Sequence, residues 1–174
     1  MAGLRLEPAA ALESLLRPTV MIGSGVMVER ANDNVSESTR LPLSFGAGAR
    51  FDQWAARIEY GTFHTTDGNA TISTSRDFET MLAWTSYDFG RETSWTPYAA
   101  AAFGMARTST ETRLAQTFES AKGTWTGLFA LAAGFRGEWM PHLYVRPELR
   151  YESAESFKTK DARMGAFVQL DFIY

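Results

Sequence analysis

The sequence predicts an all-β protein, an eight-stranded antiparallel transmembrane β-barrel of the up-and-down type. Three features predict it: a strand of period two that reaches the last residue, an alternation of short turns with longer polar connections, and tryptophans beside the short turns. In the last strand, Arg163, Gln169 and Asp171 alternate with the apolar residues Ala162, Met164, Ala166, Val168, Leu170, Phe172 and Tyr174. One face of this strand therefore meets an apolar phase, as is typical of transmembrane β-strands.

The composition excludes several other classes. The chain has 174 residues, 45% hydrophobic and 21% charged, with a net charge of -3. Charges interrupt every apolar stretch before it is long enough for a transmembrane helix. A small negative charge argues against a nucleic-acid surface, which needs a basic stripe. The absence of cysteine excludes disulfides, thiol catalysis and Cys-based zinc sites.

We expect two regions: an N-terminal segment over residues 1–18, a short helix or irregular, and a barrel over residues 19–174. Within the first, residues 8–16 favour a short helix, because Pro8 suits a helix start and Leu12, Leu15 and Leu16 share one face. The segment has no continuous apolar core and no cleavage site of a secretory signal. Because an outer-membrane protein must be exported, we expect a mature sequence behind an added start methionine.

Alternating apolar residues predict eight strands, over residues 20–30, 40–51, 54–62, 77–89, 97–110, 122–137, 143–152 and 162–174. The phase is clear in most of them. In the strand over 77–89, Phe78, Leu82 and Trp84 suggest one outward face, while Met81, Tyr87 and Phe89 compete for the other. The alanines of the strand over 97–110 give almost no contrast, so the phase of that strand also stays open.

The connections alternate between two kinds. Residues 52–53, 90–96 and 138–142 are short turns, whereas 31–38, 64–76, 111–121 and 154–160 are polar and mostly longer. Outer-membrane barrels have short periplasmic turns and longer extracellular loops, with both termini on the periplasmic side. Trp54, Trp95 and Trp139 lie in or beside the short turns, and Tyr174 lies at the same level. These four residues predict an aromatic girdle at the periplasmic interface.

A soluble β-sandwich or lipocalin-like barrel would show the same periodicity, with its apolar face turned inward. Periodicity defines the two faces of each strand but not which face is inside. The terminal Tyr174, the tryptophans gathered at one rim and the contrast between turns and loops favour the membrane protein.

The opposite face of the strands carries charges that would point into the lumen. We expect a charge network there, formed by Arg50, Arg57, Glu59, Arg136, Arg146, Glu148, Arg150, Glu152, Arg163 and Asp171. Eight strands enclose a space that side chains just fill, and charges in it must be paired or hydrated. A satisfied salt-bridge network is therefore expected, with a narrow ion or solute path as the alternative.

At this point the chain resembles the small eight-stranded outer-membrane barrels, the group of the OmpA transmembrane domain and the OmpX and OmpW types. The resemblance covers roughly residues 19–174. It rests on the strand pattern, on residues 95–98 (Trp-Thr-Pro-Tyr), on residues 146–151 (Arg-Pro-Glu-Leu-Arg-Tyr), and on the terminal alternation of Val168, Leu170, Phe172 and Tyr174. The last run looks like the signal for the barrel-assembly machinery, although the family often has Gly where Gln169 stands here.

The resemblance implies a monomer in the outer membrane of a Gram-negative bacterium. The expected partners are outer-membrane lipid, lipopolysaccharide and the barrel-assembly machinery during insertion, with no nucleic acid. We expect a structural or surface-interaction role. The alternatives are a narrow porin-like channel for small or hydrophobic solutes, as in OmpW-type barrels, and more distantly a lipid A-modifying enzyme.

No enzymatic activity, cofactor or metal is expected. Some small outer-membrane barrels are lipid A deacylases, in which a Ser nucleophile follows a His base in a His-x-Ser pair. Of the two histidines, His142 lies in a short turn, and His64 lies at the extracellular end of its strand with Thr66 where the pair needs Ser. No carboxylate aligned with His64 is evident from the sequence, so we expect His64 to be a rim residue.

Overall fold

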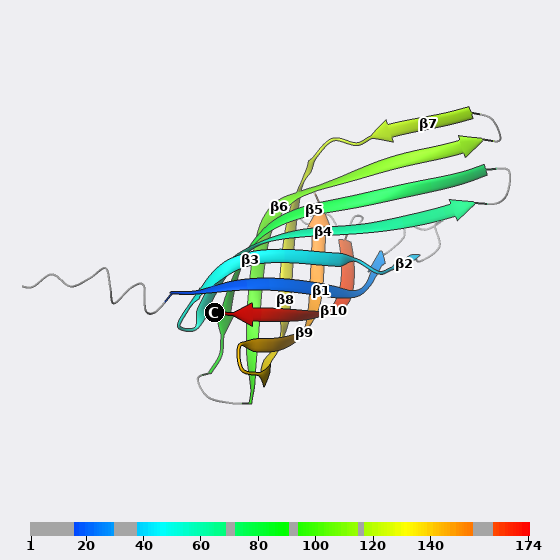
Figure 1. Ribbon diagram of the computed structural model, residues 1–174. Helices are drawn as coiled ribbons and strands as arrows, with labels where there is room; N and C mark the ends of the chain where they lie inside the picture. The colour runs from blue at the N-terminus through cyan, green and yellow to red at the C-terminus, as the bar shows by residue number, and fades with distance from the viewer. Residues whose placement is uncertain (1–15, 30–37, 69–71, 91–93, 115–116, 155–161) are drawn as a thin grey trace, which may run out of the picture.

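A computed structural model describes residues 16–29, 38–68, 72–90, 94–114, 117–154 and 162–174 (Figure 1). These residues form strands and turns. The strands are β1 (Leu16–Glu29), β2 (Ser38–Arg40), β3 (Leu43–Phe51), β4 (Trp54–Gly68), β5 (Ile72–Asp88), β6 (Trp95–Leu114), β7 (Thr117–Lys122), β8 (Thr126–Met140), β9 (Leu143–Ala154) and β10 (Ala162–Ile173). The described residues contain no helix that is long and apolar enough to cross a membrane.

The sheet closes on itself to form the predicted eight-stranded barrel. Neighbouring strands follow the order β10-β9-β8-β6-β5-β4-β3-β1, and β1 pairs again with β10 from Thr19↔Ile173 to Glu29↔Arg163. Each pairing is antiparallel. The short strands β2 and β7 attach to β1 and β6 outside this ring. The expected fold class is therefore confirmed.

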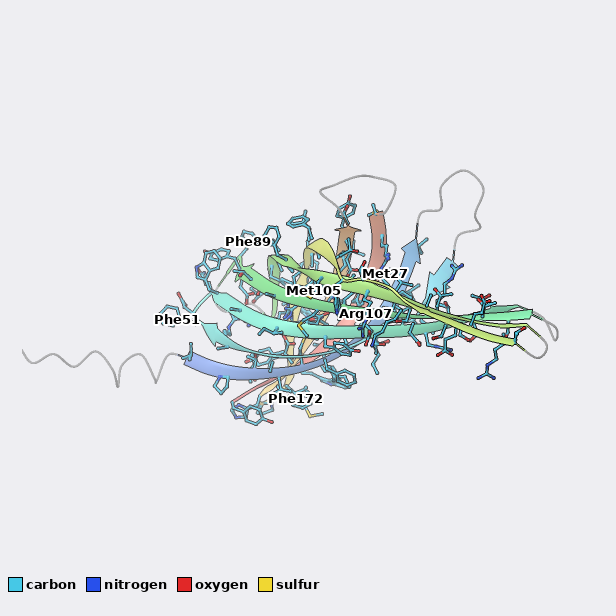
Figure 2. All side chains as sticks on the ribbon, turned by 90° about the horizontal axis from the view of Figure 1, so that it is seen from above. Met27, Phe51, Phe89, Met105, Arg107 and Phe172 are labelled. Carbon is cyan, nitrogen blue, oxygen red and sulfur yellow. The ribbon has the colours of Figure 1, made fainter. Side chains whose placement is uncertain are left out.

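The two faces of the barrel wall differ as the alternation predicts. Large apolar residues cover the outer face, among them Phe51 and Phe172 (Figure 2). In the isolated chain Ile58, Phe103 and Leu149 are 63–69% exposed. The inner face carries the buried polar residues, among them Arg57, Glu148 and Gln169. An apolar exterior around a polar interior is the reverse of a soluble barrel, and it follows from the parity of each strand.

The outward face suggested by Phe78, Leu82 and Trp84 is wrong. These three side chains are 1–4% exposed and point into the lumen, whereas Met81 and Phe89 are exposed on the outer face. With Phe63, Tyr98 and a row of alanines from β6 and β8, they form an apolar cluster inside the barrel. The sequence could not assign the outward face of β5 because both of its faces are apolar. One face is directed to the exterior and the other packs into this internal cluster.

Two of the predicted loops are strands. The ladder between β4 and β5 continues from His64↔Asp77 to Gly68↔Ser73, and β6 continues to pair with β7 as far as Leu114↔Thr117. The far ends of β4, β5 and β6 (residues 64–68, 72–77 and 109–114) and the short strand β7 extend beyond the ring of the barrel (Figure 1). We call these four segments the ribbon. Its polar, threonine-rich sequence has no apolar face to mark it, yet Thr favours the extended backbone and the ladder satisfies the peptide groups.

The N-terminal boundary also differs. β1 begins at Leu16, before the expected barrel start at residue 19, and Leu16 pairs with Phe51. The predicted helix over residues 8–16 otherwise lies outside the described residues. The strands β2 and β3 both pair with the C-terminal half of β1. They share one register, with Met27↔Arg40 and Ser24↔Leu43. The break between them falls at Pro42, which has no amide proton to donate to the ladder.

The short turns and the two ends of the barrel chain gather at one end of the barrel. The Tyr174 amide donates to the Pro18 carbonyl, the Ile173 amide donates to the His142 carbonyl, and the Asp88 amide donates to the Gln53 carbonyl. The side chains of Trp54, Trp95, Trp139 and Tyr174 are 51–72% exposed there. Tyr87 and Phe89 extend this group. The ring centroids of Trp54 and Tyr87 are 4.9 Å apart, and those of Tyr87 and Phe89 are 5.3 Å apart.

Replacing Leu149 with Arg tests which face of the wall meets lipid. Leu149 lies midway along β9 on the outer face, so a charge there should weaken insertion by roughly 2–4 kcal/mol. Refolding equilibria in lipid vesicles measure this. Ser120→Arg, on β7 beyond the ring, is the control and should cost about 0–1 kcal/mol. Equal losses at both positions would show that Leu149 does not face the membrane.

Candidate functional site: a charge network across the lumen

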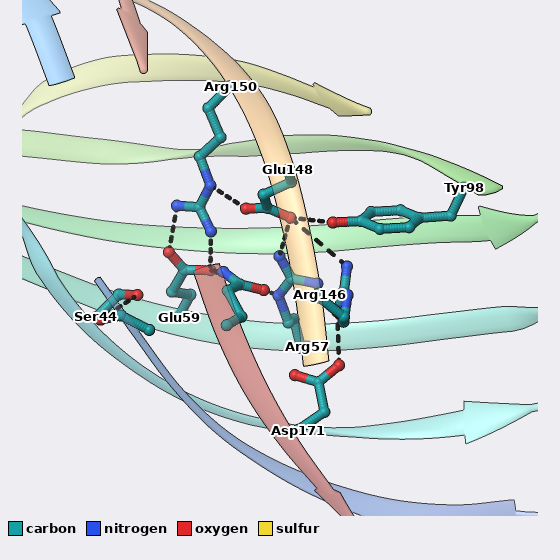
Figure 3. Close-up of polar contacts among 10 residues, drawn as sticks. Ser44, Arg57, Glu59, Tyr98, Arg146, Glu148, Arg150 and Asp171 are labelled. Carbon is teal, nitrogen blue, oxygen red and sulfur yellow. Dashed lines mark hydrogen bonds and ion pairs between the residues drawn. The ribbon is translucent and has the colours of Figure 1, made fainter. Parts of the chain in front are cut away.

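The centre of the lumen is occupied by Arg150 of β9, which joins two carboxylates (Figure 3). Its guanidinium forms a double hydrogen bond with Glu59 of β4, with Nη1 to Oε1 at 2.5 Å and Nη2 to Oε2 at 3.0 Å. Its Nε donates to Glu148, two residues earlier on the same face of β9. This fork geometry makes Arg150 the bridge between opposite walls of the barrel.

Glu148 is the second centre of the network. It accepts hydrogen bonds from the Tyr98 hydroxyl of β6 and from Arg150, and Arg146 Nη2 lies 3.7 Å away. Arg146 in turn donates to Asp171 of β10 at 3.0 Å. The ladder between β9 and β10 places Arg146 opposite Gln169, next to Asp171 on the inner face.

Aromatic rings hold the guanidinium groups from their flat sides. Arg150 lies between Trp84, at 4.8 Å, and Phe167, at 4.3 Å from the ring centroids. Arg57 also lies over Trp84, at 5.0 Å, with its Nε 3.5 Å from Glu59. Weakly hydrated, planar guanidinium groups suit such stacked sites, whereas lysine would not.

The network is balanced in charge and shielded from solvent. The guanidinium groups of Arg57, Arg146 and Arg150 pair with three carboxylates, which belong to Glu59, Glu148 and Asp171. The positive and negative charges are therefore equal in number. All six residues are 1–8% exposed. An isolated charge at such a position costs several kcal/mol, so each partner depends on the others.

A second cluster lies nearer the end with the short turns. Asp88, the last residue of β5, accepts from Arg50 at 2.6 Å and lies 2.9 Å from Arg136 Nη2. Arg136 also lies over the Tyr144 ring at 5.1 Å. The sequence placed Arg50 and Arg136 in the lumen but gave no partner for them, because the open phase of β5 hid Asp88.

The remaining expected lumen residues lie toward the other end. Glu152 is 3% exposed and faces Arg163 across the β9–β10 ladder, and Arg163 lies 3.8 Å from the Phe78 ring centroid. The structure thus divides the ten expected residues into the central network, the Asp88 cluster and this pair. Gln169, which the alternation of the last strand places on the inner face, belongs to the same interior. Tyr98, Trp84 and Phe167 also lie there and were not predicted.

Glycines lie on the inner face beside the charged residues of the neighbouring strands. A Cβ on Gly48 would lie 2.7 Å from the Cβ of Arg57, and a Cβ on Gly134 would lie 2.8 Å from the Cα of Glu148. The carbonyl oxygens of Ala56 and Pro147 would be nearer still, 2.1 Å and 2.2 Å from the Cβ of residues 48 and 134. No side chain fits at these positions without moving the neighbouring strand, so the inner glycines are part of how the network is packed.

Two small cavities lie beside the central network in the lumen. One cavity, of about 20 Å³, lies beside Arg150, Glu59 and Phe167; another of the same size lies beside Arg57, Arg146 and Asp171. Each has room for about one water molecule. The side chains between them are those of the central network.

The two histidines differ in their surroundings. His142 occupies a tight turn with φ 70° and its Nδ1 is 3.0 Å from the Ile173 carbonyl oxygen. His64 lies on the outer face of the ribbon, and the expectation that no carboxylate is aligned with it is wrong: His64 Nδ1 is 2.6 Å from Asp77 Oδ1. Asp77 lies opposite His64 in the β4–β5 ladder, which the sequence had assigned to a loop.

Metal ligation has no evident place in the described part of the chain. Those residues contain no group of three or more His, Asp or Glu side chains that could hold a metal ion. The carboxylates of Glu59, Asp88, Glu148 and Asp171 are paired with arginines in the lumen.

Solved structures share the fold of this chain. The neisserial surface protein A is similar with a TM-score of 0.70 at 14% identity, over 90% of this chain and 97% of that one. Ail, the attachment invasion locus protein of Yersinia pestis, gives 0.62 at 12% identity over 90% and 97%. The N-terminal β-barrel domain of Pseudomonas aeruginosa OprF gives 0.52 at 14% identity over 90% and 97%.

The sequence matches no protein-family model, and no curated protein matches it. At identities of this order the structural likeness concerns the fold, and the fold is that of the small eight-stranded outer-membrane barrels.

Replacing Arg150 with Leu tests how much the network stabilises the barrel. The change leaves Glu59 and Glu148 buried without their main partner, so the free energy of unfolding should fall by roughly 3–5 kcal/mol. Denaturant titration of the refolded barrel in micelles measures it. Arg76→Leu, at an exposed position of β5, should change it by about 0–1 kcal/mol. Similar values for the two variants would mean that the lumen charges are hydrated rather than mutually dependent.

Proposed function

We propose that this chain is an integral barrel of a bacterial outer membrane, with a closed lumen and a structural or surface-interaction role. The observation that carries the proposal is the central charge network, which occupies the lumen while the outer wall stays apolar. Both features suit a protein that anchors an external surface in the membrane without passing solutes through it.

The outer wall supports the membrane location. Large apolar side chains surround the barrel, and exposed aromatic side chains collect at the end of the short turns, as in the girdle of a membrane interface. The fold shared with outer-membrane barrels agrees with this location. By the same rule, the short turns, the start of β1 and the end of β10 are on the periplasmic side, and the ribbon is extracellular.

The lumen supports a non-conducting barrel. Charged side chains from β4, β9 and β10 meet across it, and the cavities on either side hold about one water each. An ion would have to displace paired charges from a site that is almost fully buried. This favours the structural role over a narrow channel.

The ribbon is the part of the described chain best placed to meet a partner. It extends past the ring, and its polar outer face includes a hollow of about 360 Å³. Ail has been crystallised with the heparin analogue sucrose octasulfate, so a barrel of this fold can carry such a ligand. We expect outer-membrane lipid and lipopolysaccharide around the barrel, the barrel-assembly machinery during insertion, and a monomer.

Conductance in planar bilayers tests the closed lumen. Wild-type protein should show little steady current, because the network fills the path. The double variant Glu148→Ala, Arg150→Ala removes adjacent members of opposite charge, and intermittent conductance should rise. Deletion of residues 67–73, which connect β4 and β5 in the sequence, is the control and should change the current little. Large, stable wild-type currents would make the channel the better description.

A further inference from the structure

A hydrogen-bonded chain of side chains crosses the outer face of the ribbon, away from the lumen network. His64 Nδ1 is 2.6 Å from Asp77 Oδ1, and His64 Nε2 is 3.0 Å from Thr66 Oγ1. Thr66 Oγ1 is in turn 3.2 Å from Ser75 Oγ. The members alternate along β4 and β5, so the pleat of the two strands places all four on one face.

A neutral imidazole is the form that can act as a base. A carboxylate only accepts, so in that form the imidazole proton lies on Nδ1 and points to Asp77. Nε2 is then an acceptor, and the Thr66 hydroxyl donates to it. This is the arrangement that prepares a hydroxyl as a nucleophile: a base within hydrogen-bond reach, oriented by a carboxylate on its other nitrogen. The Ser75 hydroxyl can donate to the Thr66 oxygen and stabilise it as its proton leaves.

We propose that Thr66, His64 and Asp77 form a hydrolytic site for acyl esters of outer-leaflet lipids. In the first step, Thr66 Oγ attacks the ester carbonyl carbon while His64 Nε2 takes the hydroxyl proton. The ester C–O bond then breaks, and His64 returns that proton to the departing alcohol. Water, deprotonated by His64, then attacks the carbonyl carbon of the acyl-threonine. The bond between this carbon and Thr66 Oγ breaks, His64 returns the proton to Thr66 Oγ, and a carboxylic acid leaves.

The surroundings of the site match an amphiphilic ester. His64 and Asp77 are 59% and 51% exposed, so the site is open along the outer face. Beside it lies the hollow of about 360 Å³, lined by Thr62, Asp77, Glu79, Arg107, Ser109 and Lys122, which suits a polar headgroup.

Apolar side chains continue the same face toward the barrel. Tyr60, Met81, Met105 and Trp125 are 37–46% exposed there. Tyr60 precedes His64 on β4 by four residues, which is about 13 Å along a strand. The site therefore lies just beyond the apolar band. At this depth the acyl ester of a lipid joins its headgroup. The assignment of a lipid substrate rests on the proposed membrane location, which the Leu149→Arg and conductance experiments test separately.

Hydrolysis of p-nitrophenyl dodecanoate by the refolded barrel in micelles tests the site. Wild type should release p-nitrophenol, and Thr66→Val and His64→Gln should each lower the rate about 100-fold or more, since positioned acid–base groups contribute factors of this order. Thr66→Ser should keep the activity. Thr65→Val, at the neighbouring hydroxyl on the opposite face, and His142→Asn, in the periplasmic turn, should leave it unchanged.

Acid quenching during turnover should leave an added dodecanoyl mass on the peptide that contains Thr66. A shift in electrophoretic mobility on heating confirms that each variant is folded. A wild-type rate no greater than that of folded Thr66→Val would overturn the proposal, as would an acyl group on another residue.

Two lipid arms identify the source of the ester. Mass spectrometry follows phosphatidylethanolamine vesicles in one and purified lipopolysaccharide in the other. A lysophospholipid with free fatty acid assigns the phospholipid, and loss of an acyl chain from lipopolysaccharide assigns that lipid. No product in either arm would refute the lipid substrate even if the p-nitrophenyl ester is cleaved.

Discussion

The pairing of buried charges inside a narrow barrel is the constraint on which the rest of this structure depends. The apolar outer wall leaves the charged residues of β4, β9 and β10 pointing inward, so arginines and carboxylates must pair with one another across the lumen. Arg150 does this most fully, with Glu59 on one side, Glu148 on the other and aromatic rings on both faces. Small residues such as Gly48 and Gly134 are then required where strands approach the charged side chains.

The same arrangement separates two surfaces with different chemistry. Inside, groups that would be reactive alone are held in mutual ion pairs and packed against rings. Outside and beyond the ring, the ribbon presents polar side chains that do not have to balance a buried charge. His64 and Asp77 lie there half-exposed, hydrogen-bonded to each other and to Thr66. The proposed hydrolytic site is therefore separate from the charge network of the lumen.

Strand parity also explains where the aromatic residues lie. Trp54, Trp95 and Trp139 lie beside the short turns and Tyr174 ends the chain at the same level, so their exposed side chains gather at one end of the barrel. β5 departs from simple alternation, because Leu82 and Trp84 point inward against the guanidinium groups while Met81 points outward. The aromatic interior there contributes flat surfaces for arginine that aliphatic side chains would not.

The sequence by itself determined the fold class, the strands and the inward parity of residues such as Arg150 and Glu148, because a period of two assigns the face of each strand. It did not determine the phase of β5, where both parities are apolar, and so it missed Asp88 and Trp84. It also gave loops in place of the ribbon, since polar strands beyond an apolar band carry no periodic signal. The partners were decided only by the tertiary structure. Strand register brings Asp77 opposite His64 on the neighbouring strand, and barrel closure brings Glu59 to Arg150, 91 residues away along the chain.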